Sequence, residues 1–127
     1  MLRKLKRRHE FLSVARMGKK FVTPGLVLQA WKRPLTLRDG AHEAIGEDVR
    51  VGYTVTKKVG NAVVRNRTKR RLRALAKEII PNYVSGAFDL VLIGRAETRN
   101  RTFGDLKIDL IKGLSCLETR RNSSVET

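Results

Sequence analysis

The sequence has 127 residues, a length that suits one domain with a single modest hydrophobic core. Its formal net charge of +16 at pH 7 far exceeds what solubility requires, so a polyanionic partner is favoured, with nucleic acid ahead of a membrane surface. One cysteine excludes an intramolecular disulfide. Because no apolar run is long enough for a membrane span or a signal peptide, we expect a cytoplasmic protein.

The first 32 residues predict a helix followed by strands. Apolar residues recur at approximately helical spacing between residues 6 and 17, and Gly18 ends the segment. A short strand is expected at 21–22, and a longer one over 26–32, whose side chains alternate between two faces. One face carries Leu26, Leu28 and Ala30, and the other carries Val27, Gln29 and Trp31.

A polar loop then precedes a more regular strand. Residues 34–48 form the loop, in which four acids accompany Arg38 alone, and we expect this loop to face away from a polyanion. Residues 49–56 alternate cleanly, which predicts a half-buried strand. Its faces carry Val49, Val51, Tyr53 and Val55 on one side and Arg50, Gly52, Thr54 and Thr56 on the other.

Residues 57–73 contain eight Lys or Arg and no Asp or Glu. Asn61 is placed to cap a helix that begins directly after it, and we expect this helix to end before Pro81. At 100° per residue, an arc of about 120° is apolar. That arc contains Val64, Thr68, Leu72, Leu75, Ala76 and Ile79, with Arg65 beside it in the first turn. The remaining surface carries Asn66, Arg67, Lys69, Arg70, Arg71 and Arg73.

The cationic side of this helix favours a binding function over a merely soluble surface. Soluble helices normally place Glu one turn from Lys or Arg, whereas here no acid occurs before Glu78. Neighbouring cations therefore repel one another until phosphates arrive. Arginine predominates, and its planar guanidinium binds phosphate bidentately and stacks on bases. A strand precedes the helix, which is wrong for a helix-turn-helix reader of DNA.

The remaining sequence completes one domain, which we place at residues 1–118. Residues 88–93 are almost continuously apolar, which predicts a strand covered on both faces. Strand, helix and strand in this order imply a parallel strand pair joined by the basic helix. Apolar residues between Phe103 and Leu117 predict a final amphipathic helix. Residues 119–127 are polar, and we expect a disordered tail.

The chain offers few candidates for catalysis. One cysteine and two isolated histidines do not make a zinc site, and neither a nucleophile–base motif nor a phosphate-cradling glycine loop is present. Asp105 and Asp109 are four residues apart in the final helix and could form a carboxylate pair. Because Lys107 and Lys112 are interleaved with them, a solvated helix face is the favoured interpretation. We therefore expect no catalytic residue in this chain.

The string from residue 57 to residue 73, KKVGNAVVRNRTKRRLR, resembles the signature of the bacterial ribonuclease P protein component. The resemblance extends upstream through RVGYTVT at 50–56 and to Leu5-Lys6, Phe11 and Gly18. It also includes the strand at 88–93 and the closing helix, and so covers most of the chain. The Arg-Asn-Arg core at this spacing is its most specific part.

The resemblance implies an α/β (α+β) two-layer sandwich in the order αβββαβα, similar to a ribosomal-protein domain, with a left-handed crossover through the basic helix. It also implies the protein subunit of an endoribonuclease that removes the 5′ leader of precursor tRNA. The catalytic centre would lie in the RNA subunit, with Mg²⁺ held mainly by RNA phosphates, and we assign no metal-binding residue in the protein. The implied contacts to the RNA subunit are Lys57, Lys58, Asn61, Arg65, Asn66, Arg67, Lys69, Arg70 and Arg73.

A second surface implied by the resemblance is a cleft between the first helix and the sheet that holds the single-stranded leader. Phe11 matches the first aromatic of that cleft, although its own pattern is explained more simply by core packing. Ala15 and Gln29 stand where many members of the family have further aromatics. Trp31 shares a strand face with Gln29 and could supply the missing ring. The predicted leader contacts are therefore Phe11, Gln29 and Trp31.

Two rival functions fit parts of the sequence. A non-catalytic ribosomal or RNA-chaperone protein would share the composition, and the Arg-Asn-Arg helix is what separates it from the ribonuclease P protein. A nuclease that acts without RNA is disfavoured because no metal-ligand pattern is present.

Overall fold

The computed structural model describes residues 2–34 and 48–117. Its elements are β1 (Arg3–Lys4), α1 (Arg8–Met17), β2 (Lys19–Val22), β3 (Leu26–Lys32), β4 (Arg50–Thr54), the 3₁₀ turn η1 (Lys57–Val59), α2 (Ala62–Tyr83), β5 (Phe88–Gly94), the 3₁₀ turn η2 (Ala96–Asn100) and α3 (Phe103–Cys116). The expected order is confirmed, with the two-residue β1 added in front of it. The expectations for the loop at 35–47 and for the tail after 118 lie outside the described residues.

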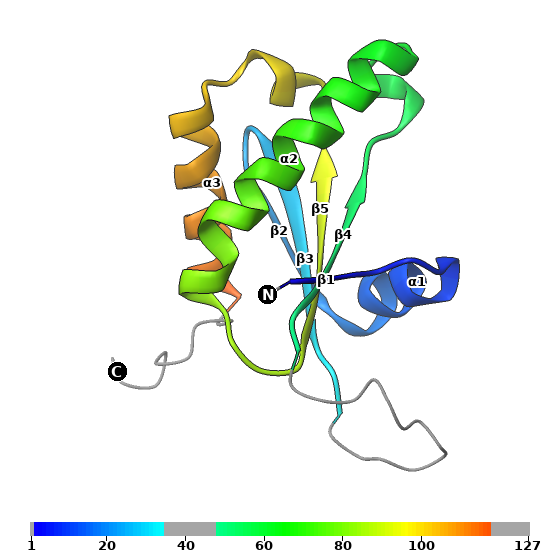
Figure 1. Ribbon diagram of the computed structural model, residues 1–127, viewed down its shortest axis with the longest axis vertical. Helices are drawn as coiled ribbons and strands as arrows, with labels where there is room; N and C mark the ends of the chain where they lie inside the picture. The colour runs from blue at the N-terminus through cyan, green and yellow to red at the C-terminus, as the bar shows by residue number, and fades with distance from the viewer. Residues whose placement is uncertain (1, 35–47, 118–127) are drawn as a thin grey trace.

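Five strands form one sheet in the order β1-β4-β5-β3-β2, so β1 and β2 are its borders. β5 is central: it pairs in parallel with β4, and all of β3 pairs with it in antiparallel register. In Figure 1 the chain rises through β4, descends in front of the sheet through α2, and rises again through β5 on the left of β4. This crossover is left-handed, against the strong general preference for right-handed connections.

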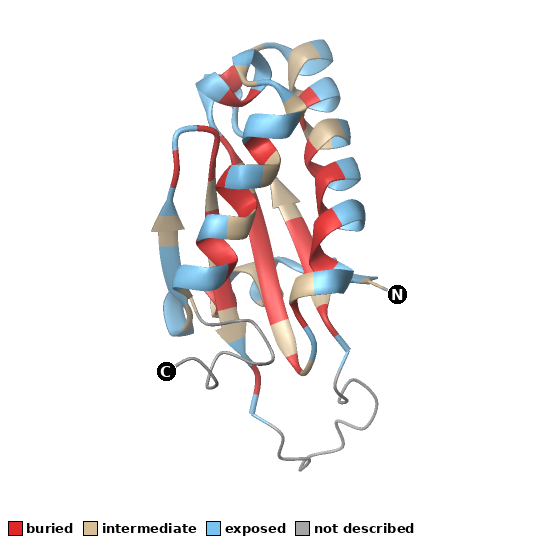
Figure 2. Cartoon of the chain, turned by 90° about the vertical axis from the view of Figure 1, so that its left-hand side faces the viewer, coloured by how far each residue is buried: buried red, intermediate tan, exposed pale blue. Residues whose placement is uncertain are grey.

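The main core lies between one face of the sheet and the two helices α2 and α3. Leu28 and Leu92 are register partners on that face and are fully buried, as Leu72 and Leu110 are on the helices. Figure 2 shows the buried residues along the strands and along the helix sides that face them. Thr68 belongs to the predicted apolar arc and is buried. Its hydroxyl donates to the Val64 carbonyl at 2.9 Å, so this polar group is paired inside the core.

The opposite face of the sheet is covered in part by α1, through a smaller cluster of buried side chains. Val14 is fully buried there with Leu5 and Val91. Gly52 of β4 has no side chain, and a Cβ atom at this position would lie 2.5 Å from the Phe11 ring. The ring of Phe11 therefore lies directly on the backbone of β4, and this strand is covered on both faces at Gly52.

The basic helix does not end before Pro81, as the sequence suggested; α2 continues to Tyr83. Proline lacks an N–H and removes one helical hydrogen bond, but its fixed φ is compatible with helical backbone. Here Pro81 is exposed in the last turn, and its buried neighbours Ile80 and Val84 attach that turn to the core. The Val84 N–H donates to the Ile80 carbonyl at 2.9 Å and closes the helix.

Asp109 does not lie on a solvated helix face, which corrects the favoured interpretation of the final helix. Its carboxylate is buried and accepts two hydrogen bonds from Arg101, at 2.8 and 3.0 Å. Asp105, one turn earlier, is exposed, and its N–H donates to the capping Thr102 hydroxyl. The two acids therefore differ in environment, and Asp109 is a structural partner of an arginine that the sequence pattern did not reveal.

Candidate RNA interface

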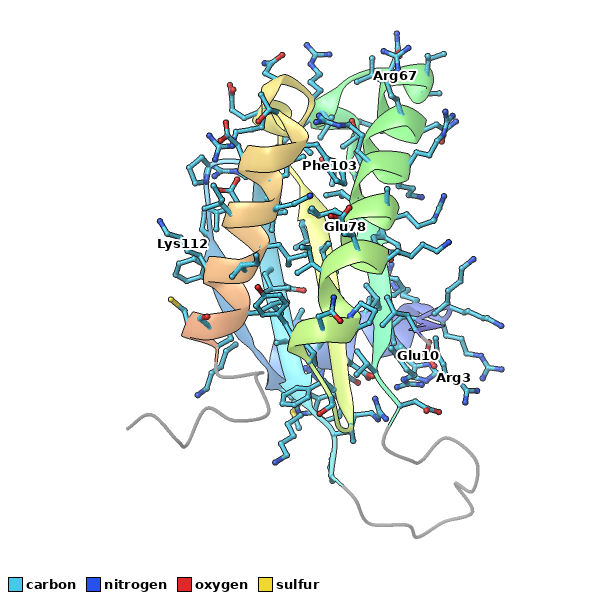
Figure 3. The ribbon with its side chains drawn as sticks, turned by 60° about the vertical axis from the view of Figure 1, so that its left-hand side comes forward. Arg3, Glu10, Arg67, Glu78, Phe103 and Lys112 are labelled. Carbon is cyan, nitrogen blue, oxygen red and sulfur yellow. The ribbon has the colours of Figure 1, made fainter. Side chains whose placement is uncertain are left out.

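The outward side of α2 and the turn before it carry most of the predicted RNA-binding residues. The helix begins where predicted, because the Asn61 side-chain oxygen accepts the Val64 N–H at 3.0 Å. Arg67 extends from the upper end of α2 away from the sheet (Figure 3). The exposed members of the predicted set are Lys57, Lys58, Asn61, Asn66, Arg67, Arg70 and Arg73, and Lys69 and Arg65 are half-buried.

No described carboxylate forms a salt bridge with any of these cations. Glu78, the acid of α2, pairs instead with Lys107 of α3 at 2.6 Å. Cations that are close together and uncompensated raise the free energy of the protein alone and attract a dense array of phosphates. The surface is therefore arranged for a polyanion rather than for internal pairing.

Two arginines of α2 have structural partners. Arg65 donates to the Gly60 carbonyl at 3.3 Å, and so helps to hold the entrance of the helix. Arg71 was expected on the solvated side, but it donates to the carbonyls of Thr98 and Arg101, at 2.7 Å each. Arg71 thus joins α2 to η2 and to the residue that pairs with Asp109.

The three predicted leader residues lie on the α1 side of the sheet. Gln29 and Trp31 share a face of β3, and both are half-buried. Gln29 is the register partner of Val91, which is in turn the partner of Gly52, beneath the Phe11 ring. Phe11 and Trp31 both pack against the small cluster around Val91. They are therefore partly core residues, and their outer surfaces remain available.

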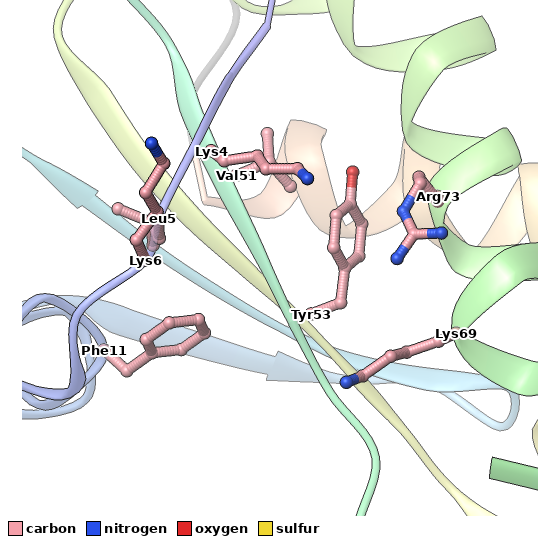
Figure 4. A pocket seen from close by; sticks show the side chains of 8 residues that line it. All are labelled: Lys4, Leu5, Lys6, Phe11, Val51, Tyr53, Lys69 and Arg73. Carbon is pink, nitrogen blue, oxygen red and sulfur yellow. The ribbon is translucent and has the colours of Figure 1, made fainter. Parts of the chain in front are cut away.

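A pocket of about 220 Å³ brings Phe11 together with cations of α2 (Figure 4). Lys69 and Arg73, one turn apart on α2, line it with Tyr53 of β4. The Arg73 guanidinium lies 5.8 Å from the centre of the Tyr53 ring. Burial raises the pKa of the Tyr53 phenol and the charge of Arg73 opposes this, so the hydroxyl is protonated at neutral pH.

The polar and aromatic lining of this pocket includes three residues that were not among the predicted site residues: Lys4, Lys6 and Tyr53. Tyr53 was grouped with Val49, Val51 and Val55 on one face of its strand, and the alternation gave no sign that it lies at the border of the core. The lysines come from the segment around β1, whose parallel pairing with β4 extends over only two residues and leaves no periodic signal. The four-residue spacing of Lys69 and Arg73 was the one available sign that they face the same way.

A second group of cations, near the other end of β4, is internal. Arg33 and Arg50 both pair with the fully buried Asp89, at 2.6 and 2.7 Å, and Arg50 also pairs with Glu10 of α1 at 3.2 Å. Burial raises the pKa of Glu10, but hydrogen bonds from the N–H groups of Arg7 and Lys6 and the charge of Arg50 outweigh it and leave the pKa below its ordinary value. The Asp89 carboxylate raises the pKa of Arg50.

Within 2–34 and 48–117, no three His, Cys, Asp or Glu side chains are grouped so that they could hold a metal ion. None of the described helices has both the length and the apolar character needed to cross a membrane.

Comparison with known proteins decides the family. The family model for ribonuclease P matches residues 2–118. This chain belongs to the ribonuclease P protein family. It is 51% identical over 111 residues to the ribonuclease P protein component of Gluconacetobacter diazotrophicus, covering 87% of each chain. It is 42% identical over 113 residues to the component of Paramagnetospirillum magneticum, covering 89% of this chain and 80% of that one.

Solved structures of ribonuclease P proteins share the fold. The protein from Staphylococcus aureus matches with a TM-score of 0.71 at 23% identity, covering 93% of this chain and 97% of that one. The protein from Thermotoga maritima matches with a TM-score of 0.68 at 23% identity, covering 98% of each chain. The resemblance inferred from the Arg-Asn-Arg helix is thus confirmed, and the alternative of a ribosomal or RNA-chaperone protein is set aside in favour of ribonuclease P.

Proposed function

We propose that this protein is the cytoplasmic subunit that binds the catalytic RNA of bacterial ribonuclease P and assists removal of the 5′ leader from precursor tRNA. The observation that carries the proposal is the outward side of α2, where exposed cations such as Arg67 and Arg70 have no described carboxylate partner. Phosphates of a folded RNA would supply the missing counter-charge, and binding would release condensed counterions. Family membership supplies the reaction, which is tRNA processing by an endoribonuclease complex.

The α1 side of the sheet is our candidate for the leader. Phe11 and Trp31 are half-buried aromatic rings that pack against the same small cluster, and Gln29 adds an amide on the same strand face as Trp31. Aromatic rings combined with nearby positive charge are the usual means of holding single-stranded RNA without strict sequence preference. Where the resemblance would place further aromatics, at Ala15 and Gln29, Trp31 is our candidate for the missing ring.

We assign hydrolysis to the RNA subunit and the Mg²⁺ ions mainly to its phosphates. The described side chains offer no cluster of acidic or histidine ligands that fits such an ion. The contribution of this chain would be to neutralise phosphate repulsion with Arg67, Arg70 and their neighbours, and to hold the leader beside the catalytic RNA. Both effects are strongest at low ionic strength.

Reconstitution tests the proposal. The purified protein is added to a bacterial ribonuclease P RNA and a precursor tRNA at a low Mg²⁺ concentration, and release of the 5′ leader is followed on a gel. We expect cleavage that neither the protein alone nor the RNA alone supports under the same conditions. If the protein leaves the rate of leader release unchanged across a range of Mg²⁺ concentrations, the proposed function is wrong.

The leader assignment has its own test. Phe11→Leu keeps an apolar side chain on Gly52 but removes the ring, so affinity for precursor tRNA should fall more than affinity for mature tRNA. Equal losses for the two substrates would contradict the assignment of Phe11 to the leader. Leu12→Ala, at an exposed position on α1, is the control and should affect neither affinity.

A further inference from the structure

The outer edge of β4 is only partly covered by a neighbouring strand. Pairing with β1 ends at Val51, whereas pairing with β5 on the other side continues to Thr54. From Gly52 to Thr54, no described strand lies along the outer edge. The pocket of about 220 Å³ opens at this point, between the β1 segment, α1 and α2 (Figure 4).

The lining of this pocket combines two kinds of chemistry. Lys4, Lys6, Lys69 and Arg73 line it, and none of the lining residues is acidic. None of these four side chains forms a salt bridge within the described parts of the chain. The lining also includes two aromatic rings, which lie on opposite sides of β4: Tyr53 on the side of α2 and Phe11 on the side of α1 (Figure 4).

Tyr53 is the best-placed ring for stacking. Arg73 lies beside one side of its ring, and the flexible, exposed Lys4 approaches from the other side (Figure 4). Movement of Lys4 would open that side to a planar ligand, which would then lie on the ring face opposite the Arg73 cation. The protonated phenol adds a hydrogen-bond donor at the rim of the pocket.

We propose that this pocket binds one unstacked nucleotide of a single-stranded RNA segment, with its base against Tyr53 and its phosphates among Lys4, Lys6, Lys69 and Arg73. The proposal rests on the RNA-binding function proposed above and adds a site to it. RNA crossing the uncovered edge of β4 here would connect the cationic side of α2 with the leader side of the sheet. Phe11 belongs to the leader side and also lines this pocket, together with cations of α2.

Size and shape favour a single nucleotide over larger ligands. The volume is below the roughly 300–1,000 Å³ of pockets that enclose drug-sized molecules. A base in a duplex is stacked on both faces and paired at its edge, so it cannot reach the Tyr53 ring. A single-stranded or bulged nucleotide can present its flat face, and its flanking phosphates then lie near the four cations.

The test isolates the contribution of one base. A short RNA strand made of abasic residues, with a single central uridine, is compared with the fully abasic strand by fluorescence anisotropy at low salt. The two strands have the same phosphates, so the difference in their affinities reports the contacts of the base alone. We expect the full-length protein to prefer the strand with the base by about 5- to 100-fold.

Variants at position 53 decide whether the base lies on this ring. Tyr53→Leu keeps the apolar packing and should abolish the preference, whereas Tyr53→Phe keeps the ring and should retain it within about twofold. Thermal unfolding confirms that both variants are folded. A 5-iodouridine in the central position should, on irradiation, cross-link to Tyr53, and mass spectrometry identifies the peptide.

Two results would overturn the proposal: a Tyr53→Leu protein that keeps the preference for the base, or cross-links that form at Trp31 but not at Tyr53. Either would leave the proposed function intact, provided that the wild-type protein still promotes leader release in the reconstitution. Conversely, the wild-type protein could bind the strand with the base more tightly and still fail to promote leader release. That result would contradict the proposed function but leave the proposal of a nucleotide-binding pocket standing.

Discussion

Arginine occurs in two opposite environments in this protein. Around Asp89, the guanidinium groups of Arg33 and Arg50 converge on a buried carboxylate at 2.6 and 2.7 Å, and Arg33 also donates to the Asp48 carbonyl at 2.8 Å. On the outward side of α2, Arg67 and Arg70 are exposed, and no described group pairs with them.

The partners of each guanidinium separate the charges that stabilise the fold from those left for the RNA partner proposed above. A buried cation needs a carboxylate nearby, because desolvation without a counter-charge costs several kcal/mol. An exposed group of cations without carboxylates has no such role in the fold and slightly destabilises the free protein. The net charge of +16 does not separate the two kinds of arginine, whereas their partners do.

The largest effect is expected from removing the internal carboxylate. Asp89→Ala leaves Arg33 and Arg50 without their shared anion, so the free energy of unfolding should fall by about 3–5 kcal/mol. Urea denaturation with a constant m-value measures this loss. A decrease of less than about 1 kcal/mol would show that the two regions are not as different as their geometry indicates.

The second effect concerns the outward region. Arg67→Ala combined with Arg70→Ala should weaken binding to the RNA subunit. The slope of log affinity against log salt should become shallower by about 2, because each lost phosphate contact reduces the magnitude of this slope by about 1. Stability should stay the same or rise. Lys112→Ala, on the exposed side of α3, is the control. A filter-binding slope that stays unchanged in the double variant would remove these arginines from the interface.

An intermediate effect is expected from Glu10, at the edge of the internal group. Because its folded-state pKa is depressed, its contribution to stability is present above the ordinary pKa of a glutamate and is lost as pH falls through the folded value. Glu10→Gln should therefore lower stability by about 1–2 kcal/mol at neutral pH and make little difference near pH 3. Denaturation at the two pH values measures this; equal losses at both would show that the charge of Glu10 is not what matters.

The smallest effect is expected where a salt bridge is exposed. Glu78 and Lys107 lie 2.6 Å apart, but both side chains are in contact with solvent. Glu78→Gln should change the free energy of unfolding by less than about 1 kcal/mol. A loss comparable with that of Asp89→Ala would mean that burial does not govern the value of ion pairs in this protein.

Local patterns predicted much of the fold. The strand at 26–32 was bounded correctly by its alternation, Asn61 marked the start of α2, and the apolar arc from Val64 to Ile79 identified the side of that helix that faces the sheet. The parallel pairing of β4 with β5 followed from the order of strand, helix and strand. These features depend on residues close together in the chain, where spacing carries the information.

Features that depend on distant residues were not predictable in this way. Arg33 and Asp89 are 56 residues apart, and nothing in either segment indicates their pairing. The sequence around Asp109 indicated a solvated acid, and only the structure shows that Arg101 pairs with it. The same limit applies to the pocket, since Lys4, Tyr53 and Arg73 come from three separate segments. The predicted contacts of Arg67, Phe11 and their neighbours with RNA remain predictions.

The two borders of the sheet bear on how the protein avoids pairing with copies of itself. β1 consists of Arg3 and Lys4, and β2 begins with Lys19 and Lys20, all four of them exposed. Open strand edges invite pairing with other chains and growth into aggregates, and short or lysine-bearing edges oppose this. Copies that approached border to border would bring like charges together. The folded chain is therefore protected against edge-to-edge aggregation by the same excess of positive charge that, in the function proposed above, would attract RNA.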